Sequence, residues 1–290
     1  MITGKVLITG GTGLLGQSIA HNLRVQGTEV DLLSTRQSIT DLNLVKGYEC
    51  IIHLSGAPVA ERWTSSHIQE MRRSRIDSIL QIRSHITSLP PDARPRCLIS
   101  ASAVGIYRDH ETELMTVDSH PSHGPLAELV SDWESAVQSF GSIGVRPVSI
   151  RLGLILAPDG GFLARLLPTY RLGLGACIGT GKYPVPWIHI DDAAKLFIWA
   201  ASTSKARGIL PGTSTSSLTM HEFHQLLGLT LGRKQWLPRI PMFLMKLVLG
   251  QMAQILDSGQ PIDNHALTRL GFQFEYEDLE EATKALLARR

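Results

Sequence analysis

A glycine-rich loop near the N-terminus has the residue types and the spacing of a phosphate-binding turn. It consists of Gly10, Gly11, Thr12, Gly13, Leu14, Leu15 and Gly16, with three glycines spaced G-x-x-G-x-x-G. Glycine is required where a chain turns tightly, where backbone amides approach a pyrophosphate, and where a helix meets a strand. An apolar run precedes the loop and a helical pattern follows it, so unpaired N–H groups at the start of the helix would face phosphates. The loop therefore predicts a dinucleotide site, and a glycine-rich turn without a ligand is the alternative.

The residues that follow the next apolar run indicate which dinucleotide is bound. A carboxylate at this place would bind the ribose 2′-hydroxyl of NAD, whereas an arginine would bind the 2′-phosphate of NADP. The chain has Ser34, Thr35 and Arg36 there and no carboxylate at the end of the run, since Asp31 comes too early. A guanidinium can hold a phosphate with a charge-assisted fork of hydrogen bonds. We therefore expect NADP(H) as the cofactor, with an exposed loop arginine as the alternative explanation of Arg36.

Short apolar runs alternate with helical patterns through the first half of the chain, as expected for a parallel sheet. Runs such as VLIT, CIIHL and CLIS lack polar alternation, which is typical of strands covered on both faces. The expected strands are 5–9, 30–34, 50–54, 97–100 and 146–151, and the expected helices are 14–25, 66–89 and 125–140. The fold class is therefore α/β, a Rossmann-like doubly wound parallel sheet.

The pattern changes beyond residue 151, where glycines at 160, 161, 173, 175, 179 and 181 predict a loop-dominated region. Asp191 and Asp192 are expected to cap a helix that ends at Ala201, and residues 219–222 have a capping-box sequence. Helical patterns follow at 241–260 and 276–288. We expect a dinucleotide-binding domain of residues 1–153 with 185–205, and a smaller, mostly helical substrate-side domain of residues 154–184 with 206–290.

The composition excludes several classes of protein. With 28 basic and 26 acidic residues spread along the chain, there is no basic block for a nucleic acid. Three cysteines stand alone at 50, 97 and 177, which argues against disulfides or a zinc site. The apolar stretch 242–256 is interrupted by Lys246 and two glutamines, and it is too short to span a bilayer. We expect a cytoplasmic protein with a small-molecule substrate and neither a nucleic acid nor a membrane as partner.

Several further motifs give the chain a family resemblance. These are IIHLSGAPVAERW, SASAVGIY, RLGLILAPDGG, PWIHIDD and the ending GFQFEYEDLEEATKALL, together with the glycine-rich loop. The chain resembles the extended short-chain dehydrogenase/reductase superfamily and, within it, the SDR39U1-like group of epimerase-family proteins. The resemblance covers nearly the whole chain. It implies a Rossmann domain with a small helical C-terminal domain.

The resemblance also implies roles for individual residues. Those implied to lie beside the cofactor are Leu54, Ser55, Gly56, Glu70, Ile99 and Ile155, with Asp41 and Leu42 near the adenine. Helices 66–89 and 125–140 correspond to a pair that such proteins use to form homodimers, with simple core packing as the alternative. A dimer through these helices is therefore an expectation.

The chain departs from the superfamily at its acid–base residues. The superfamily uses a Tyr-x-x-x-Lys pair, in which the lysine lowers the pKa of the tyrosine phenol. Leu126 and Val130 stand at those positions here, and neither side chain can transfer a proton. Ser102 matches the serine or threonine that hydrogen-bonds the reacting oxygen. Tyr107 is the nearest phenol, and it is expected either to replace the missing acid or to be a structural tyrosine at the strand end.

Four residues are expected on the substrate side: Arg62, Trp63, Arg75 and His189. Trp63 could stack on a ring, and the arginines or His189 could shift the pKa of Tyr107. For His189 the alternative is a buried histidine that hydrogen-bonds backbone. The leading hypothesis is an NADP(H)-dependent oxidoreductase or epimerase-like enzyme that acts on a small carbonyl or sugar-like substrate. A non-catalytic NADP(H)-binding sensor or scaffold and a structural dimer with a vestigial pocket are the alternatives.

Overall fold

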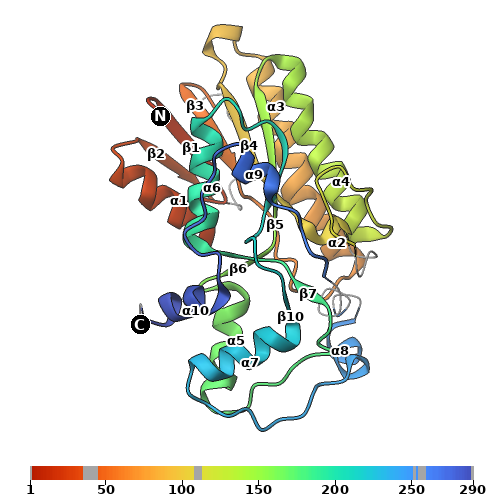
Figure 1. Cartoon of the computed structure of the whole chain (residues 1–290). Coiled ribbons are helices and arrows are strands. Elements are labelled where there is room, and N and C mark those ends of the chain that lie inside the picture. Colours follow the sequence, from red (N-terminus) through yellow and green to blue (C-terminus); the bar gives the residue numbers. More distant parts are fainter. Residues whose placement is uncertain (1, 35–44, 108–112, 251–252, 254–258, 289–290) are drawn as a thin grey trace.

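The computed structural model describes residues 2–34, 45–107, 113–250, 253 and 259–288. An α/β layer forms the upper part of the molecule, and a smaller lobe lies below the carboxyl edge of its sheet (Figure 1). Within the described residues, no helix is long and apolar enough to cross a membrane.

The central sheet has six parallel strands in the order β2-β1-β3-β4-β5-β9. They are β1 (Lys5–Thr9), β2 (Val30–Leu33), β3 (Tyr48–His53), β4 (Cys97–Ala103), β5 (Arg146–Leu152) and β9 (Gly208–Gly212). Ile8, Ile52, Ile99 and Val148 are register partners across four strands, and all are buried. Both faces of the sheet are covered, which explains why these strands are apolar without alternation.

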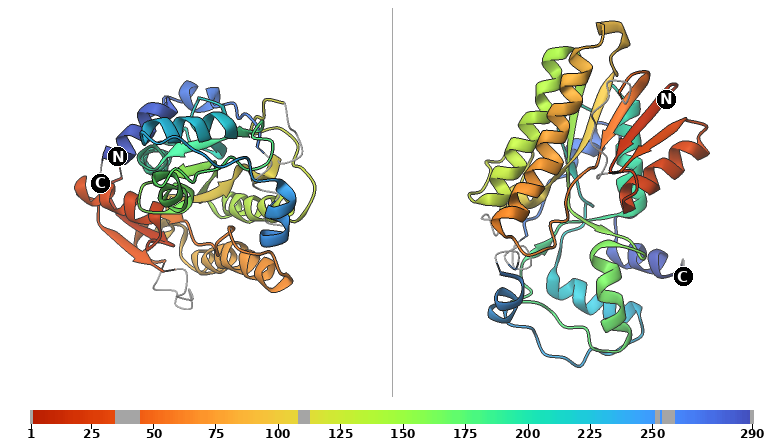
Figure 2. Two further views of the ribbon diagram at one scale, coloured as in Figure 1. Left: turned by 90° about the horizontal axis from the view of Figure 1, so that it is seen from below. Right: turned by 180° about the vertical axis from the view of Figure 1, so that it is seen from behind.

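Helices cover both faces of the sheet (Figure 2). One face holds α1 (Leu14–Val25) and α6 (Ile190–Ser202). The other holds α2 (Ser65–Arg72), the π-helical segment η2 (Arg73–Asp77), α3 (Ser78–Thr87), α4 (Pro125–Gln138) and the short 3-10 segments η3 (Pro91–Ala93), η4 (Val104–Tyr107) and η5 (Ser139–Ile143). Arg72 of α2 pairs with Asp132 of α4 at 2.6 Å, so an ion pair links the two helical segments at this point. The dimer through this pair stays a prediction.

The lobe below the sheet is built from short strands and small helices (Figure 1). Its strands are β6 (Leu154–Leu156), β7 (Pro184–Val185), β8 (Trp187–His189) and β10 (Leu218–Thr219), and its helices are α5 (Gly161–Arg171), α7 (Met220–Thr230), α8 (Met242–Leu249) and α10 (Leu279–Ala288). Helix α9 (His265–Arg269) lies against β9 instead. Because β9 extends the main sheet, residues 208–212 belong with the sheet, which corrects the expected division at residue 206.

Two local expectations were wrong. The region from 160 to 181 is not all loop, because Gly161–Arg171 forms helix α5. Its buried residues Leu163, Leu167 and Tyr170 recur at helical spacing, and this apolar face outweighs the neighbouring glycines and Pro168. Helix α6 is capped by His189, whose Nδ1 accepts a hydrogen bond from the Asp191 amide at 3.1 Å, rather than by the aspartates. The capping box at Thr219 and Glu222 is confirmed.

Asp192 ties the C-terminal segment to the sheet layer. Its carboxylate is fully buried and accepts hydrogen bonds from the amides of Glu275 at 2.8 Å and Tyr276 at 2.9 Å. Burial raises the pKa of this carboxyl group, and the Tyr276 amide opposes the shift. Because both donors are backbone groups 83 and 84 residues away in sequence, the interaction fixes where the chain returns before α10.

We predict that Asp192→Ala destabilises the protein by about 3 kcal/mol, because two charge-assisted hydrogen bonds are lost and two amides are left without their acceptor. Asp191→Ala removes the same charge from the first turn of α6 at a partly exposed position and should cost less than about 1 kcal/mol. Urea denaturation measures both variants. Equal losses of stability would contradict the role given to the buried carboxylate.

Candidate functional site

The glycine-rich loop lies at the point where the strand order reverses. Strand β1 has β2 on one side and β3 on the other. The connection after β1 therefore leads to one side of this strand, and the connection after β2 leads back to its other side. The loop starts at Gly10, directly after β1, and α1 begins at Leu14. In open α/β sheets, ligands bind in the crevice outside the carboxyl ends of the strands at such a switch point.

The glycines of the loop are required by close backbone packing. Gly10 has φ +69°, and a Cβ there would lie 2.7 Å from the backbone of Leu54 and Ser55. A Cβ on Gly16 would lie 2.7 Å from Cα of Gly11. These contacts hold the loop flat against the end of β3, where Leu54 donates its amide hydrogen to Thr9 at 2.9 Å. Because the glycines have no side chains, the space beside the backbone amides of this loop, here called the glycine cradle, stays open for a pyrophosphate.

The start of α1 is open to an anion. Its N-cap residue, Gly13, has no side chain to cover the first amides, and the first turn has no acidic residue. The helix therefore presents partly positive N–H groups without a competing carboxylate in that turn. The Gly11 amide donates to Leu33 at 3.2 Å, which brings the end of β2 and the half-buried Ser34 beside the loop. Thr35, Arg36, Asp41 and Leu42 lie outside the described residues.

A buried histidine beneath the loop was not singled out from the sequence. His53 at the end of β3 is fully buried, with Nδ1 2.6 Å from the Thr9 hydroxyl and Nε2 3.2 Å from the Ser78 hydroxyl. Burial lowers the pKa of His53 to about 3, so the ring is neutral at physiological pH. A single histidine inside an apolar run gives no sign that its partners come from two other elements.

A cavity of about 650 Å³ opens below the carboxyl edge of the sheet. Leu14 of the glycine-rich loop forms part of its wall, as do Ile155 and Ala103, so the cavity continues from the phosphate loop toward the lower lobe. Its lining is almost entirely apolar, and the lining residues among the described ones with polar side chains are Arg165, Tyr183 and Gln260. Leu126, at the expected position of the catalytic tyrosine, also lines it.

Arg75 lies behind the cofactor side of the cleft and not in the cavity. Its guanidinium donates to the carbonyl oxygens of Ala57 at 2.9 Å and Met71 at 3.3 Å, and lies 5.3 Å from the Trp133 ring. A Cβ on Gly56 would lie 2.7 Å from this guanidinium, which explains the glycine. Burial lowers the pKa of Arg75 to about 10. These contacts hold the 56–57 backbone in place.

The other residues expected on the substrate side are separated by the structure. Trp63 is buried and donates its indole N–H to Val59 at 3.0 Å. Arg62 and Glu70 line a separate shallow hollow at the start of α2. His189 is fully buried, caps α6 and stacks on Tyr276 with ring centroids 3.8 Å apart. The geometry of His189 fits the buried, backbone-bonded alternative. None of the three residues Arg62, Trp63 and His189 is among the described residues that line the large cavity.

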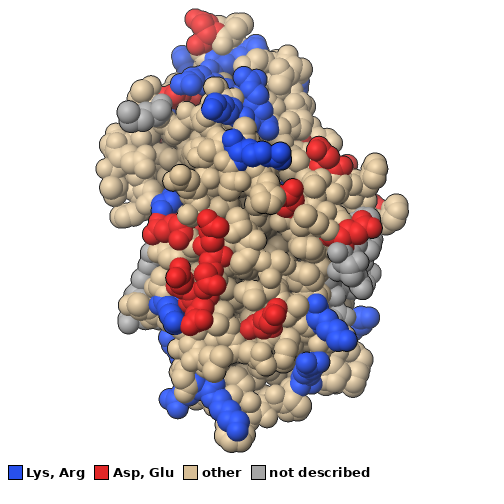
Figure 3. Space-filling view, in the orientation of Figure 1, with Lys and Arg blue, Asp and Glu red and all other residues tan. Residues whose placement is uncertain are grey.

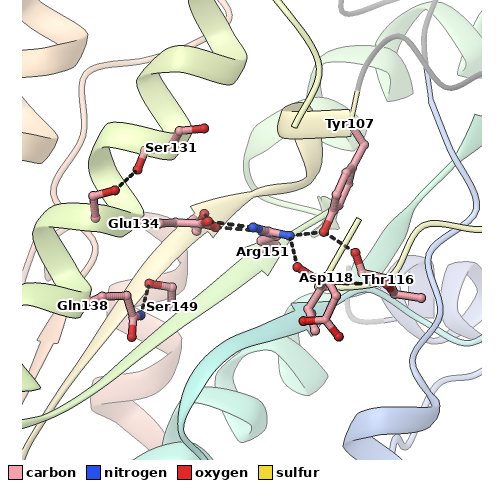
Figure 4. A network of polar contacts seen from close by, with 11 residues as sticks. Tyr107, Thr116, Asp118, Ser131, Glu134, Gln138, Ser149 and Arg151 are labelled. Atoms are coloured by element: carbon pink, nitrogen blue, oxygen red, sulfur yellow. Dashed lines mark hydrogen bonds and ion pairs between the residues drawn. The ribbon is translucent and has the colours of Figure 1, made fainter. Parts of the chain in front are cut away.

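Ser102 and Tyr107 belong to one buried polar network. Figure 4 shows Glu134, Arg151 and Tyr107 of this network. The Ser102 hydroxyl donates to Glu134 at 2.5 Å, and Glu134 accepts two hydrogen bonds from Arg151 at 2.8 and 2.7 Å. Arg151 also donates to the Tyr107 hydroxyl, which in turn donates to the carbonyl oxygen of Thr116 at 2.7 Å. Burial raises the pKa of Tyr107, and the charge of Arg151 opposes the shift.

This network favours a structural role for Tyr107. The side chain is 1% exposed, and its single hydrogen is engaged with a backbone carbonyl. Ser102, at 3% exposure, uses its hydrogen on Glu134, while the following residues Ala103 and Val104 reach the cavity wall. The arrangement therefore fits the structural alternative for Tyr107 better than proton donation. The sequence did not reveal the network, because Glu134 and Arg151 come from α4 and β5.

Comparison with known proteins assigns the family. The profile of the NAD dependent epimerase/dehydratase family matches residues 6–209, well over half of the chain. The chain belongs to the NAD dependent epimerase/dehydratase family. A second profile, described as a domain of unknown function (DUF1731), matches residues 240–286 in the lower lobe.

Full-length relatives place the chain more narrowly within this family. It is 30% identical over 301 residues to the Epimerase family protein SDR39U1 homolog, chloroplastic, of Arabidopsis thaliana, across 97% of this chain and 86% of that protein. It is 31% identical to the Epimerase family protein SDR39U1 of Mus musculus, across 98% and 100%. The resemblance to the SDR39U1-like group is therefore confirmed.

Solved structures confirm the fold class. The crystal structure of human epimerase family protein SDR39U1 (isoform2) with NADPH matches with a TM-score of 0.87 and 26% identity, covering 99% of this chain and 100% of that one. A nucleoside-diphosphate sugar epimerase from Corynebacterium glutamicum matches with a TM-score of 0.80 and 25% identity, covering 99% of this chain and 59% of that one. The chain is thus an NAD(P)-binding protein of the epimerase family, and its glycine cradle fits a dinucleotide.

We predict that Gly10→Ala abolishes cofactor binding and destabilises the fold, because the new Cβ would collide with the end of β3. Gly27→Ala is a matched control, since Gly27 also has positive φ (+80°) but a Cβ there meets nothing within 4 Å. The control should lose about 1–2 kcal/mol from backbone strain alone. Gly10→Ala should lose about 1–3 kcal/mol more from overpacking. Urea denaturation and titration with NADPH measure both effects, and equal behaviour of the two variants would contradict the close-approach argument.

We predict that His53 makes the protein less stable as the pH falls from about 6.5 toward 3. The folded state keeps His53 neutral, whereas the unfolded chain binds a proton at its ordinary pKa near 6.5. Protonation thus favours unfolding, by about 1.4 kcal/mol for each pH unit in that window. His53→Asn should flatten the curve of unfolding free energy against pH, while His265→Asn at an exposed position serves as the control. Parallel curves for wild type and His53→Asn would refute the assignment.

Proposed function

We propose that this protein is an NADP(H)-dependent oxidoreductase or epimerase-like enzyme that acts on a small, largely apolar carbonyl compound. The observation that carries the proposal is the apolar cavity of about 650 Å³, which shares Leu14 with the glycine-rich loop. A substrate in this cavity would lie beside the far end of a dinucleotide whose pyrophosphate meets the start of α1.

The proposed cofactor is NADP(H) rather than NAD(H). In the sequence, Ser34, Thr35 and Arg36 follow Leu33 without a carboxylate, and a human relative has been crystallised with NADPH. When bound, NADPH supplies a hydride. The protein's own residues would do three things: the glycine-rich loop would hold the pyrophosphate, Arg36 would hold the 2′-phosphate, and the apolar wall would exclude water from the cavity.

The cavity wall supports an apolar substrate over a sugar. Each buried hydroxyl of a sugar needs a hydrogen-bonding partner, and an unmade hydrogen bond is costly. The described lining residues include only Arg165 as a charged side chain, together with Tyr183 and Gln260. A compact carbonyl compound with at most one negative group, directed at Arg165, satisfies this wall better than a nucleotide sugar does.

We infer that water supplies the proton that accompanies hydride transfer. Leu126 lines the cavity at the position of the superfamily tyrosine, and Val130 is 1% exposed within α4. Ser102 and Tyr107 are engaged with Glu134 and Thr116. A carbonyl reduction that uses water as its acid is slower than one with a positioned phenol, because a general acid contributes about 10²–10⁴-fold.

The same observations support a second candidate function, a non-catalytic NADP(H)-binding sensor or scaffold. Such a protein needs the glycine cradle and Arg36 but no proton donor. Cofactor binding to the folded state alone stabilises it, by about 2.7 kcal/mol at a concentration 100 times Kd. The engaged hydroxyls of Ser102 and Tyr107 are compatible with this function.

We predict that NADPH raises the melting temperature more than NADH does, and that Arg36→Glu weakens NADPH binding by about 30-fold, because a charge-assisted fork on the 2′-phosphate is replaced by repulsion. Arg207→Glu, at an exposed position at the opposite edge of the sheet, changes the net charge equally and should leave binding unchanged. Thermal shift and fluorescence titration with the four nicotinamide dinucleotides measure the preference. An equal response to NADH and NADPH in the wild type would contradict the role of Arg36.

Turnover separates the two functions. NADPH consumption is followed with simple ketones and aldehydes. Because UDP-glucose is an alcohol, it serves as the polar comparison in the opposite direction, with NADP⁺ as hydride acceptor and NADPH formation as the signal. Consumption with the apolar carbonyl compounds supports the enzyme. Tight cofactor binding with no turnover of any compound supports the sensor. NADPH formation from NADP⁺ with UDP-glucose, without turnover of the ketones or aldehydes, refutes the apolar substrate.

A further inference from the structure

The end of the lower lobe farthest from the sheet has an unusual number of exposed apolar side chains. We define this surface, the lower rim, as residues 171–174, 229–239 and helix α8. Trp236 is 73% exposed, Leu229 77% and Leu172 74%, although the chain buries most of its other large apolar side chains. The exposed apolar residues of the rim are Leu172, Leu174, Leu229, Trp236, Leu237, Phe243, Leu244 and Leu247. Exposed apolar groups that gather in this way mark an interaction surface.

Backbone contacts bring these segments together as one surface. The Trp236 amide donates to Gly173 at 3.1 Å, so the loop after α5 lies beside the loop after α7. Farther along, the Ile240 amide donates to Cys177 at 2.9 Å, and α8 begins two residues later. Figures 1 and 2 show the two loops and α8 along the same lower edge of the molecule.

The rim is also uniformly basic. No Asp or Glu occurs between residues 160 and 182 or between 223 and 250, and Figure 3 shows basic and uncharged side chains along this end. Lys234 Nζ lies 4.7 Å from the centre of the Trp236 ring. The exposed cations of the rim are Arg171, Arg233, Lys234, Arg239 and Lys246.

We propose that the lower rim docks on an anionic membrane surface. Trp and Phe with leucines suit the boundary between headgroups and acyl chains, and interleaved Lys and Arg reach the headgroup phosphates with their long side chains. Each cation near an anionic leaflet strengthens such binding. This role lies beyond the proposed function and does not depend on it, and it departs from the expectation that the chain has no membrane partner.

Charge decides between a membrane and a second copy of the chain. A two-fold interface pairs a patch with itself, so two copies joined by the rim would oppose the same cations without a carboxylate to pair them. An anionic lipid surface supplies the opposite charge everywhere. Helix α8 has eight residues, far fewer than a bilayer requires, so the contact is interfacial and not spanning.

The test is co-sedimentation of the full chain with vesicles of phosphatidylserine and, separately, of phosphatidylcholine. We expect at least about tenfold tighter binding to phosphatidylserine, and weakening by added salt. Trp236 is the most exposed of the five tryptophans, so its emission should shift to the blue on binding. Failure to bind phosphatidylserine, or equal binding to both lipids, overturns the proposal.

Matched variants locate the surface. Arg233→Glu with Lys234→Glu should weaken binding to phosphatidylserine by about tenfold or more. Lys205→Glu with Arg207→Glu makes the same charge change at exposed positions just before β9, at the opposite end, and should retain binding. Trp236→Ala with Phe243→Ala should weaken binding while circular dichroism stays unchanged. Equal loss in both charge variants, or a dimer that dissociates on rim substitution in place of lipid binding, overturns the proposal.

Discussion

The contact between Gly10 and the end of β3 is the constraint on which the rest of the site depends. The strand-to-helix turn leaves no space for a side chain between Gly10 and the Leu54–Ser55 backbone. This contact sets the start of α1 at Leu14, whose side chain lies against Gly160 and forms part of the cavity wall. The position of the phosphate loop and that of the cavity wall thus both depend on the close contact between Gly10 and the Leu54–Ser55 backbone. Thr9, directly before Gly10, is in turn held by the buried ring of His53.

Binding and chemistry are separated in this structure. The loop that fits a dinucleotide has glycines where Cβ atoms would collide, and the helix after it begins without a side-chain cap. At the positions where the family resemblance implies proton transfer, Leu126 lines the cavity, and the hydroxyl groups of Ser102 and Tyr107 bind the Glu134–Arg151 ion pair. That pair is buried, so removing either partner would leave an uncompensated charge. The network therefore constrains which residues can change around the cavity.

The sequence predicted the features that depend on local patterns. Continuous apolar runs located five strands of the sheet, and the glycine spacing located the phosphate loop. Helix α5 was missed because its glycine-rich surroundings mask a short apolar face. Contacts between residues that are distant in sequence could not be predicted, and nothing in the segment around Tyr107 indicates that Arg151 binds it. Burial was also missed, because nothing beside Trp63 or Arg75 in the sequence indicates that both side chains are buried. His189 was predicted on the substrate side because of the residues next to it in sequence, but its ring accepts a hydrogen bond from the Asp191 amide at the start of α6.

The π-helical segment Arg73–Asp77 directs two consecutive side chains at the chain that follows β3. The Ser74 hydroxyl accepts the Ala57 amide at 2.8 Å, and Arg75 donates to the Ala57 carbonyl oxygen at 2.9 Å. This wall of the cleft is therefore hydrogen-bonded within the protein before any ligand arrives. A ligand that settles against it need not freeze a loose segment, so little conformational entropy is surrendered on that side. The widened helical turn in this way makes the cleft preorganised.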